Sequence, residues 1–266
     1  MILISGFVTI VVSIVLMLWI FKMKKDDPFP KFTVIKVLIG GWLSYLISSA
    51  ISIAALFAVP MLRFGPADYI AAWRDAAAGN AASLLAFSQQ STPNIWAALI
   101  KSLIAVALVE ELIKFVTMRL MARKQDTVIN RFDAIALCAL VGIGFQIFED
   151  IGYAATGGVV LAISRALMPF HFTFGAIMGY FYGKYKKWGK KSDLCFAIAL
   201  PTVIHWIYDF SVINIETFEI LVFPAAVSVV ALWAITVFMI VKIRRWSVDE
   251  EMRAYIAVEK GEQQNA

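Results

Sequence analysis

The chain has 266 residues, of which 61% are hydrophobic and only 16% are charged. Its mean hydropathy is +0.79, which points to a bilayer and excludes a disordered chain and a disulfide-stapled secreted domain. The net charge is +5, but the basic residues lie in short loops between apolar segments. That pattern suits an anionic membrane surface and requires no nucleic-acid partner.

Seven apolar segments approach or exceed the ~20 residues that a helix needs to cross a bilayer. They cover residues 2–21, 34–59, 95–118, 134–155, 169–183, 194–213 and 220–243. We therefore predict an all-α, polytopic membrane protein of about seven transmembrane helices, with residues 1–245 as its transmembrane domain. The stretch Val159–Met168 is predicted as a half-helix or as an extension of the fifth span.

Lysine and arginine residues gather in every second loop, and the intervening loops hold few. The basic loops contain Lys22, Lys24, Lys25 and Lys31; Arg119, Arg123, Lys124 and Arg131; Lys184, Lys186, Lys187, Lys190 and Lys191; and Lys242, Arg244 and Arg245. By the positive-inside rule, we expect the N-terminus outside and the C-terminus in the cytoplasm. The first span has no basic residues before it, so it is predicted to be a retained anchor.

Two segments are predicted to lie outside the bilayer. The loop 60–94 contains a helix that begins after Pro66 and stops near Gly79. The tail, residues 246–266, opens with a capping-box pattern from Ser247 to Glu250, which predicts a short cytoplasmic helix. Elsewhere, Cys138 and Cys195 stand in apolar runs, and both are predicted to be small buried hydrophobic residues.

Ionisable residues inside the predicted spans are the strongest functional signal, because each costs ~2.5–3.5 kcal/mol at mid-bilayer depth on insertion scales. They are Glu110, Glu111 and Lys114 in the third span, Glu149 and Asp150 in the fourth, His171 in the fifth, and His205 and Asp209 in the sixth. Any one could be structural. Polar sites on four different spans are hard to explain as independent packing.

Helical spacing places several of these residues on shared faces. Lys114 lies one turn beyond Glu110 and can neutralise Glu110 or its neighbour. His205 and Asp209 are four residues apart, so the carboxylate can orient the imidazole. In the fifth span, small residues recur every four positions, which permits close approach of another helix; they are Gly175, Gly179 and Gly183.

This set of residue types suits hydrolysis, which needs a base to activate water and a donor for the developing oxyanion. No Ser-His-Asp arrangement is apparent. Metal dependence stays open, because zinc or another divalent metal accepts carboxylate and imidazole ligands, yet the HExxH pattern is absent. The candidate ligands are Glu149, His171, His205 and Asp209.

Three short patterns resemble, in order, the signatures of PrsW-type intramembrane proteases. They are Glu110-Glu111-x-x-Lys114, Phe145-x-x-x-Glu149 and His205-x-x-x-Asp209. The segment from Arg165 to Gly183, which includes His171, is similar to the region that those proteins place between the second and third signatures. The distantly related CAAX prenyl proteases and bacteriocin-immunity proteases have EExxxR, FxxxH and HxxxN, so this chain departs from them at Lys114, Glu149 and Asp209.

The resemblance implies a protease core at about residues 95–215 and a role for each matched residue. Glu110 would activate water, Glu111 and Lys114 would support it, and Glu149, His205 and Asp209 would complete the site. His171 is the candidate oxyanion donor, and Phe145 and Arg165 are supporting residues. The implied substrate is a membrane-anchored protein, such as a single-span anti-sigma factor, in a bacterial-type cytoplasmic (inner) membrane. The oligomeric state is not indicated.

Two alternatives come from other functional classes. A non-catalytic scaffold subunit would use the polar residues to hold helices together. A proton-coupled transporter would use Glu110, Glu149 and His205 as a relay. Replacing Glu110 by glutamine separates the scaffold from the protease, because an amide preserves shape but cannot act as a base.

Overall fold

The computed structural model describes residues 2–25, 28–80, 82–83, 86–87, 94–122, 130–156, 165, 167–215 and 217–264. Every regular element within these ranges is helical, which confirms the all-α prediction. The helices are α1 (Ile2–Met23), α2 (Lys31–Phe64), α3 (Pro66–Ala77), α5 (Ile95–Lys101), the π-helix η1 (Ser102–Ala107), α6 (Leu108–Ala122), α7 (Arg131–Thr156), α9 (Phe170–Trp188), α10 (Lys191–Ile213), the 3-10 helix η2 (Glu219–Leu221) and α11 (Val222–Gln264).

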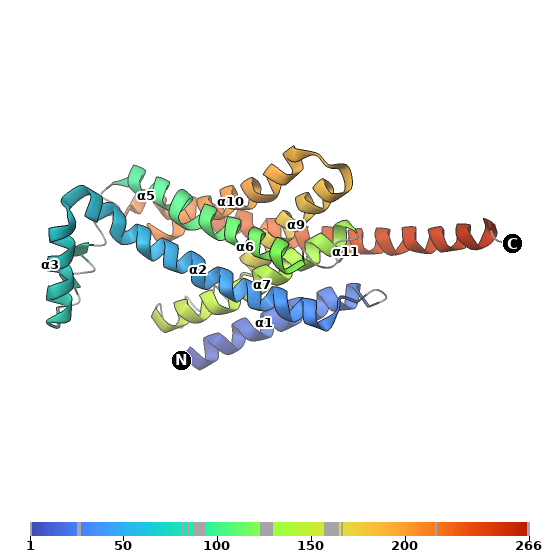
Figure 1. Ribbon diagram of the computed structural model, residues 1–266, viewed down its shortest axis with the longest axis horizontal. Coiled ribbons are helices and arrows are strands. Elements are labelled where there is room, and N and C mark those ends of the chain that lie inside the picture. Colours follow the sequence, from blue (N-terminus) through green and yellow to red (C-terminus); the bar gives the residue numbers. More distant parts are fainter. Residues whose placement is uncertain are drawn as a thin grey trace.

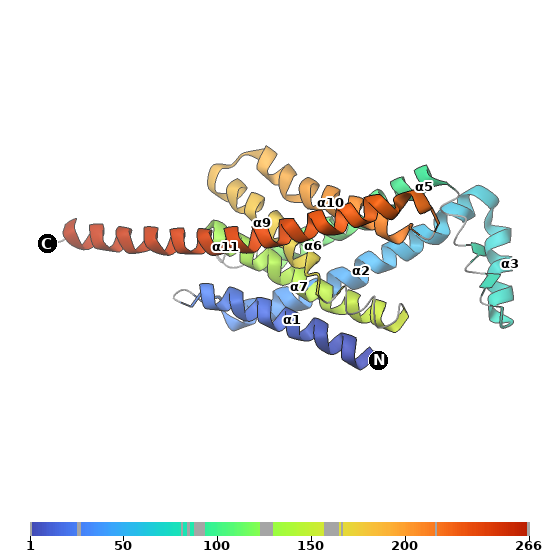
Figure 2. The same ribbon diagram turned by 180° about the vertical axis from the view of Figure 1, so that it is seen from behind.

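Each of the seven predicted spans contains a helix. Four helical stretches among the described residues are long and apolar enough to cross a membrane: Lys31–Leu62, Arg131–Tyr153, Lys191–Ile213 and Glu219–Ser247. A multi-pass membrane protein is therefore supported, while the count of seven spans and the orientation stay predictions. Figures 1 and 2 show successive long helices running in alternating directions along the long axis, so their basic flanks fall at one end.

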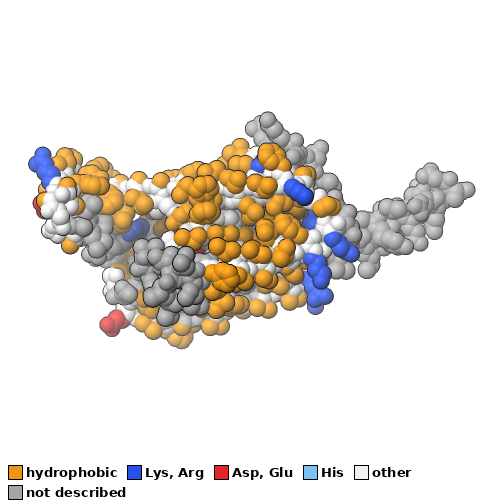
Figure 3. Space-filling model, turned by 90° about the horizontal axis from the view of Figure 1, so that it is seen from below, with side chains coloured by type: hydrophobic (Ala, Val, Ile, Leu, Met, Phe, Trp, Pro, Cys, Tyr) orange, Lys and Arg blue, Asp and Glu red, His pale blue; other side chains and the backbone are white. Residues whose placement is uncertain are grey.

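The surface of the bundle is suited to lipid. Large apolar side chains are exposed on several helices, among them Leu18, Ile47, Val203 and Phe238. Figure 3 shows hydrophobic side chains over the middle of one face, with lysine and arginine side chains gathered near the end from which the C-terminal helix projects. Exposed apolar patches of this extent are rare on soluble monomers and typical of a membrane surface.

Helix α7 is the centre of the fold. It packs against α1, α2, α6, α9 and α11, and its residues 132–146 are all buried. Cys138 lies in this buried stretch, as predicted, but the prediction for Cys195 is wrong because its position on α10 is exposed. No exposed side is left over residues 132–146, which explains why this stretch is apolar apart from Asp133 and Gln146.

The predicted small-residue stripe is the contact between α9 and α7. A Cβ atom added at Gly175 would lie 2.3 Å from the carbonyl oxygen of Cys138, and one at Gly179 would lie 2.4 Å from that of Ala134. On the α7 side, a Cβ atom at Gly142 would lie 2.1 Å from the carbonyl oxygen of His171. The backbones touch here, so these glycines fix the position of α9 on α7.

The third predicted span is not one regular helix. The π-helix η1 separates α5 from α6 and ends three residues before Glu110. Neighbouring helices bind backbone carbonyls in and just before it: the Ser52 hydroxyl donates to the carbonyl of Ala105 in η1 at 2.5 Å, and the Trp206 indole donates to that of Leu99 in α5 at 2.9 Å. A π segment shifts the rotational phase of the residues that follow, so η1 helps to set where α6 points its carboxylates.

Outside the predicted spans, α3 confirms the helix that begins at Pro66, and the chain leaves it through Gly79 at a φ of +100°. The tail is helical as far as Gln264, but α11 continues into it without a break, so no separate helix starts at Ser247. The Ser247 hydroxyl donates to the carbonyl of Arg244 within this helix and caps no N-terminus. Most of the predicted half-helix Val159–Met168 lies outside the described residues.

We predict that Gly142→Ala destabilises the protein by about 1–3 kcal/mol, because the new methyl group must push the α9 backbone away from α7. Thermal unfolding in detergent should show a clear fall in Tm. Gly152→Ala is the matched control on the same helix, since among the described residues its methyl group would meet the end of the Tyr45 side chain, which can move aside. An equal fall in both variants would contradict this account of the α7–α9 contact.

Candidate active site

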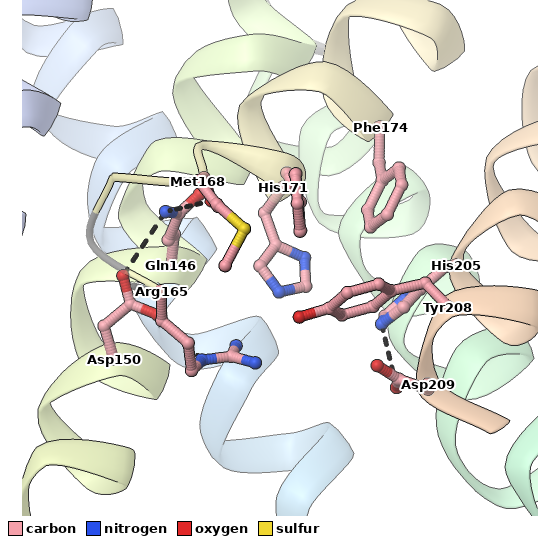
Figure 4. A pocket seen from close by; sticks show the side chains of 10 residues that line it. Gln146, Asp150, Arg165, Met168, His171, Phe174, His205, Tyr208 and Asp209 are labelled. Atoms are coloured by element: carbon pink, nitrogen blue, oxygen red, sulfur yellow. Dashed lines mark hydrogen bonds and ion pairs between the residues drawn. The ribbon is translucent and has the colours of Figure 1, made fainter. Parts of the chain in front are cut away.

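Ionisable side chains from α6, α7, α9 and α10 meet in one cluster inside the bundle. The sequence could not show that the residues from four spans lie at the same depth, and the structure brings them together. Figure 4 shows His171, His205, Tyr208 and Asp209 converging from two helices on the space beside Arg165. The residues of the cluster are Glu110, Glu111, Lys114, Glu149, Asp150, Arg165, His171, His205 and Asp209.

Lys114 is the hub of this cluster. Its Nζ atom lies 2.7 Å from Oε1 of Glu111, 2.8 Å from Nδ1 of His171 and 3.7 Å from Oε2 of Glu110. The ammonium also stands 4.1 Å from the centre of the Phe145 ring, a cation–π contact that suits a site without water. The predicted pairing with the two glutamates is confirmed, and the closer partner is Glu111.

His171 is bound at both ring nitrogens. Its Nε2 atom lies 2.6 Å from Oε2 of Glu149, while Nδ1 faces the Lys114 ammonium. An ammonium can only donate a hydrogen bond, so Nδ1 is the acceptor. The ring proton is therefore on Nε2, which donates a hydrogen bond to Glu149. The contacts therefore assign a neutral imidazole that links the lysine on α6 to the carboxylate on α7.

His205 lies between two carboxylates. Nδ1 is 2.9 Å from Oε1 of Glu111, and Nε2 is 3.1 Å from Oδ2 of Asp209, which confirms the predicted pairing along α10. Its ring stacks on Phe174 with the ring centres 4.8 Å apart. Because each nitrogen faces a carboxylate oxygen, a doubly protonated, cationic imidazole satisfies both contacts best.

Arg165 neutralises the other side of the cluster. Its guanidinium binds Glu149 through one terminal nitrogen and binds Oδ1 of Asp150 through Nε at 3.2 Å. The other oxygen of Asp150 accepts hydrogen bonds from Gln146 and from Thr9 of α1, each at 3.3 Å. The sequence analysis gave no role to Asp150 or Gln146, although the presence of an acid inside a span is the signal that identified Glu149.

A small cavity lies against the cluster. Its volume is about 10 Å³, which is about the space that one water molecule needs. The lining includes His171, His205, Asp209 and Tyr208, with Arg165, Asp150 and Gln146 on the other side. Among the described residues, no serine or cysteine lines it.

The cluster holds more acid than base. Within the described part of the chain, five carboxyl groups share it with two basic side chains, Lys114 and Arg165, besides the two histidines. The Oε2 atoms of Glu110 and Glu111 are buried and make no hydrogen bond to any described residue. An uncompensated buried charge is strongly unfavourable, so the site favours protons, a cationic His205 or a bound cation.

Three residues have the arrangement expected of a metal site. One ligand atom from each of Glu110, His171 and His205 lies within 4.8 Å of the others. Two histidines and one glutamate form a ligand set known from catalytic zinc sites. Of the four candidate ligands from the sequence, Glu149 and Asp209 lie outside this group. Glu149 binds His171 at 2.6 Å, and Asp209 binds His205 at 3.1 Å.

Comparisons with known proteins agree with these motifs. The family described as PrsW family intramembrane metalloprotease matches residues 33–241. Curated proteins named Protease PrsW are similar: that of Oceanobacillus iheyensis is 32% identical over 52% of this chain and 65% of its own length, and that of Geobacillus kaustophilus is 34% identical over 41% and 50%. The chain thus spans half to somewhat under two thirds of these relatives. No solved structure matches.

We predict that Arg165→Met destabilises the protein by about 3–5 kcal/mol, because it leaves two buried carboxylates without their cation. Thermal unfolding in detergent is the measurement. Adding Glu149→Gln and Asp150→Asn to the variant should restore part of the lost Tm.

Lys187→Met is the control for this comparison, since that lysine is exposed on α9 and, among the described residues, its ammonium contacts the Trp188 ring and no carboxylate. Its Tm should change little. If Arg165→Met unfolds at the same temperature as Lys187→Met, the buried ion pairs do not stabilise the site as argued.

Proposed function

Because the chain belongs to the PrsW family of intramembrane proteases, we propose that it hydrolyses a peptide bond of a membrane-anchored protein. The observation that carries this proposal is the meeting of Glu110, Lys114, His171 and His205 in one cluster inside an apolar bundle. The two histidines of this cluster line a cavity of water size. A single-span regulator of the anti-sigma-factor type, in the cytoplasmic membrane of a bacterium, is the proposed substrate.

Glu110 is the proposed general base. Its Oε2 atom makes no hydrogen bond to any described residue and lies 3.9 Å from Nε2 of His205. This oxygen is available to take a proton from a water molecule as the water oxygen attacks the peptide carbonyl. Glu111, by contrast, gives one oxygen to both Lys114 and His205, at 2.7 and 2.9 Å, so its role is to hold those two cations in place.

The Lys114 ammonium is the proposed oxyanion donor. The sequence had pointed to His171, but the contacts leave that residue no spare proton: one nitrogen accepts from Lys114 and the other donates to Glu149. A positive charge that is fixed in a water-poor site stabilises a developing oxyanion strongly. His171 then acts by positioning the lysine.

His205 is placed to complete the reaction. As a cation held between Glu111 and Asp209, it can give the Nε2 proton to the leaving amine when the carbon–nitrogen bond of the tetrahedral intermediate breaks. Glu110 can then pass the proton that it took from water back to Nε2 of His205, which lies 3.9 Å away, and both residues return to their starting protonation states. No covalent acyl-enzyme forms in this scheme.

A divalent metal is the second proposal, supported by the spacing of Glu110, His171 and His205 and by their burial. When bound, such an ion polarises a carbonyl and makes its water a better nucleophile. Glu111 and Glu149 would hold the two imidazoles in orientation through their other nitrogens, as carboxylates do around many metal-bound histidines. Lys114 and Asp209 must then each release an imidazole nitrogen, so that both histidines can offer a ligand atom.

We predict that Glu110→Gln and His205→Ala each abolish the cleavage that wild-type cells show. Protein N-termini in membranes from cells with matched expression are the measurement, and they identify the substrate at the same time. Glu219→Gln is the control, because this exposed residue lies outside the cluster.

The same experiment separates the protease from the scaffold and the transporter. A cut present with wild type and Glu219→Gln, and absent with the two site variants, establishes proteolysis. Identical termini in all four membranes, with every variant folded and inserted, would overturn the proposed activity and leave the two other classes.

We predict that the purified protein binds about one equivalent of divalent metal, and that Glu110→Gln and His205→Ala each lower that content severalfold by removing a ligand. Elemental analysis of the detergent-solubilised protein measures this without reference to activity. Full cleavage by protein stripped of metal would reject the metal and leave the glutamate mechanism alone.

A further inference from the structure

The short helix α3 has three distinct faces. Tyr69, Ala72 and Ala76 form the face that packs on the protein, where the Tyr69 ring meets Phe57 at 6.0 Å and Phe87 at 5.7 Å between ring centres. The other two faces are exposed, and they differ in chemistry. Most of the surface of α3 therefore has no protein neighbour among the described residues.

One exposed face is an apolar stripe. Pro66, Ile70, Trp73 and Ala77 follow one another at helical spacing, and the side chains of Ile70 and Trp73 are 48% and 49% exposed. At 100° per residue, Asp68 and Asp75 lie on the opposite side of the helix from this stripe, and both are exposed. The helix is thus amphipathic, and its apolar stripe is a different face from the one that packs on the protein.

The position of α3 places this stripe at a membrane surface. The candidate span on α2 ends at Leu62, and α3 begins four residues later, after a turn at Gly65 with a φ of +99°. Figures 1 and 2 both show α3 running across the long axis of the bundle, at the end away from the projecting helix. A helix that crosses the spanning direction at the end of a span lies in the membrane plane.

Other exposed apolar side chains continue the stripe. Leu62 is 84% exposed, Phe64 is 43% exposed, and Trp96, at the start of α5, is 70% exposed. Tryptophan and other amphipathic aromatic residues favour the boundary between lipid and water. Exposed apolar side chains thus precede and follow the stripe along the chain, at the ends of the helices next to α3.

We propose that α3 is an interfacial helix: Ile70 and Trp73 insert into the lipid at the surface opposite the basic end, while Asp68 and Asp75 face water. The bilayer is the partner, since a helix with a charged side opposite an apolar side lies flat in the interface. Asp68, Asp75 and the lone Arg74 give the helix no excess of positive charge, so insertion depends on apolar contact and needs no anionic lipid.

Site-directed spin labelling tests the proposal. Single cysteines at positions 68, 70, 73 and 75 are introduced into a Cys138→Ala, Cys195→Ala background, and the labelled protein is placed in phosphatidylcholine nanodiscs. Labels at Val203, exposed on a spanning helix, and at Lys187, in the basic end, are the lipid and water references. The readout is relaxation enhancement by oxygen, which concentrates in lipid, and by a water-soluble nickel chelate.

We expect labels at positions 70 and 73 to match the label at Val203. Their ratio of oxygen accessibility to nickel accessibility should be several times higher than the ratio at positions 68 and 75. If all four positions match Lys187, α3 lies in water and the proposal is overturned. If positions 70 and 73 are shielded from both reagents, a protein surface covers the stripe, and the lipid assignment is equally overturned. The positions are exposed, so the labels disturb no packing.

Discussion

Burying charge in an apolar bundle is the constraint on which the rest of this structure depends. Each carboxylate in the cluster must have a partner, and the partners come from other helices: Lys114 on α6 reaches His171 on α9, and His205 on α10 reaches back to Glu111. An unpaired charge at this depth would be strongly unfavourable. The ion pairs therefore specify which helix faces meet, and they also place the proposed catalytic groups within reach of one another.

The packing of the helix backbones fixes the positions of the side chains in this network. Helix α9 lies against α7 with backbone contact at Gly142 and Gly175, so the imidazole of His171 is set relative to Glu149 by main-chain packing. On the other side, the π-helix η1 sets the rotation of α6 just before its two glutamates. A rigid frame of this kind is what positions reacting groups in a catalytic site.

The proposed chemistry follows from which hydrogen-bonding positions are already taken. Glu149 and Asp209 are engaged with histidines, and His171 has both nitrogens engaged, so these residues orient others. The Oε2 atoms of Glu110 and Glu111 both lack a hydrogen-bond partner in the described part of the chain, but the other oxygen of Glu111 is bound by Lys114 and His205. Glu110 is thus the less constrained of the two glutamates and can accept a proton or hold a cation, and both proposed mechanisms depend on it.

The amino-acid sequence by itself determined the helical class, the positions of the long apolar helices and the identity of most site residues. The reason is physical: apolar length and buried ionisable groups leave clear local patterns, and spacing of four residues fixes pairs such as His205 with Asp209. The sequence also assigned a helix start to Ser247 and burial to Cys195, where local patterns were misleading because neither reports what lies beside the helix.

Only the tertiary structure decided which residues of different helices touch. The sequence did not reveal that Lys114 binds His171, that Glu111 binds His205, or that Asp150 joins Arg165 and Thr9. Nor could it choose Glu110 over Glu149 as the third member of the candidate metal group. Contacts between helices depend on rotation and depth, which small residues and the π-helix adjust, and no spacing within one helix records them.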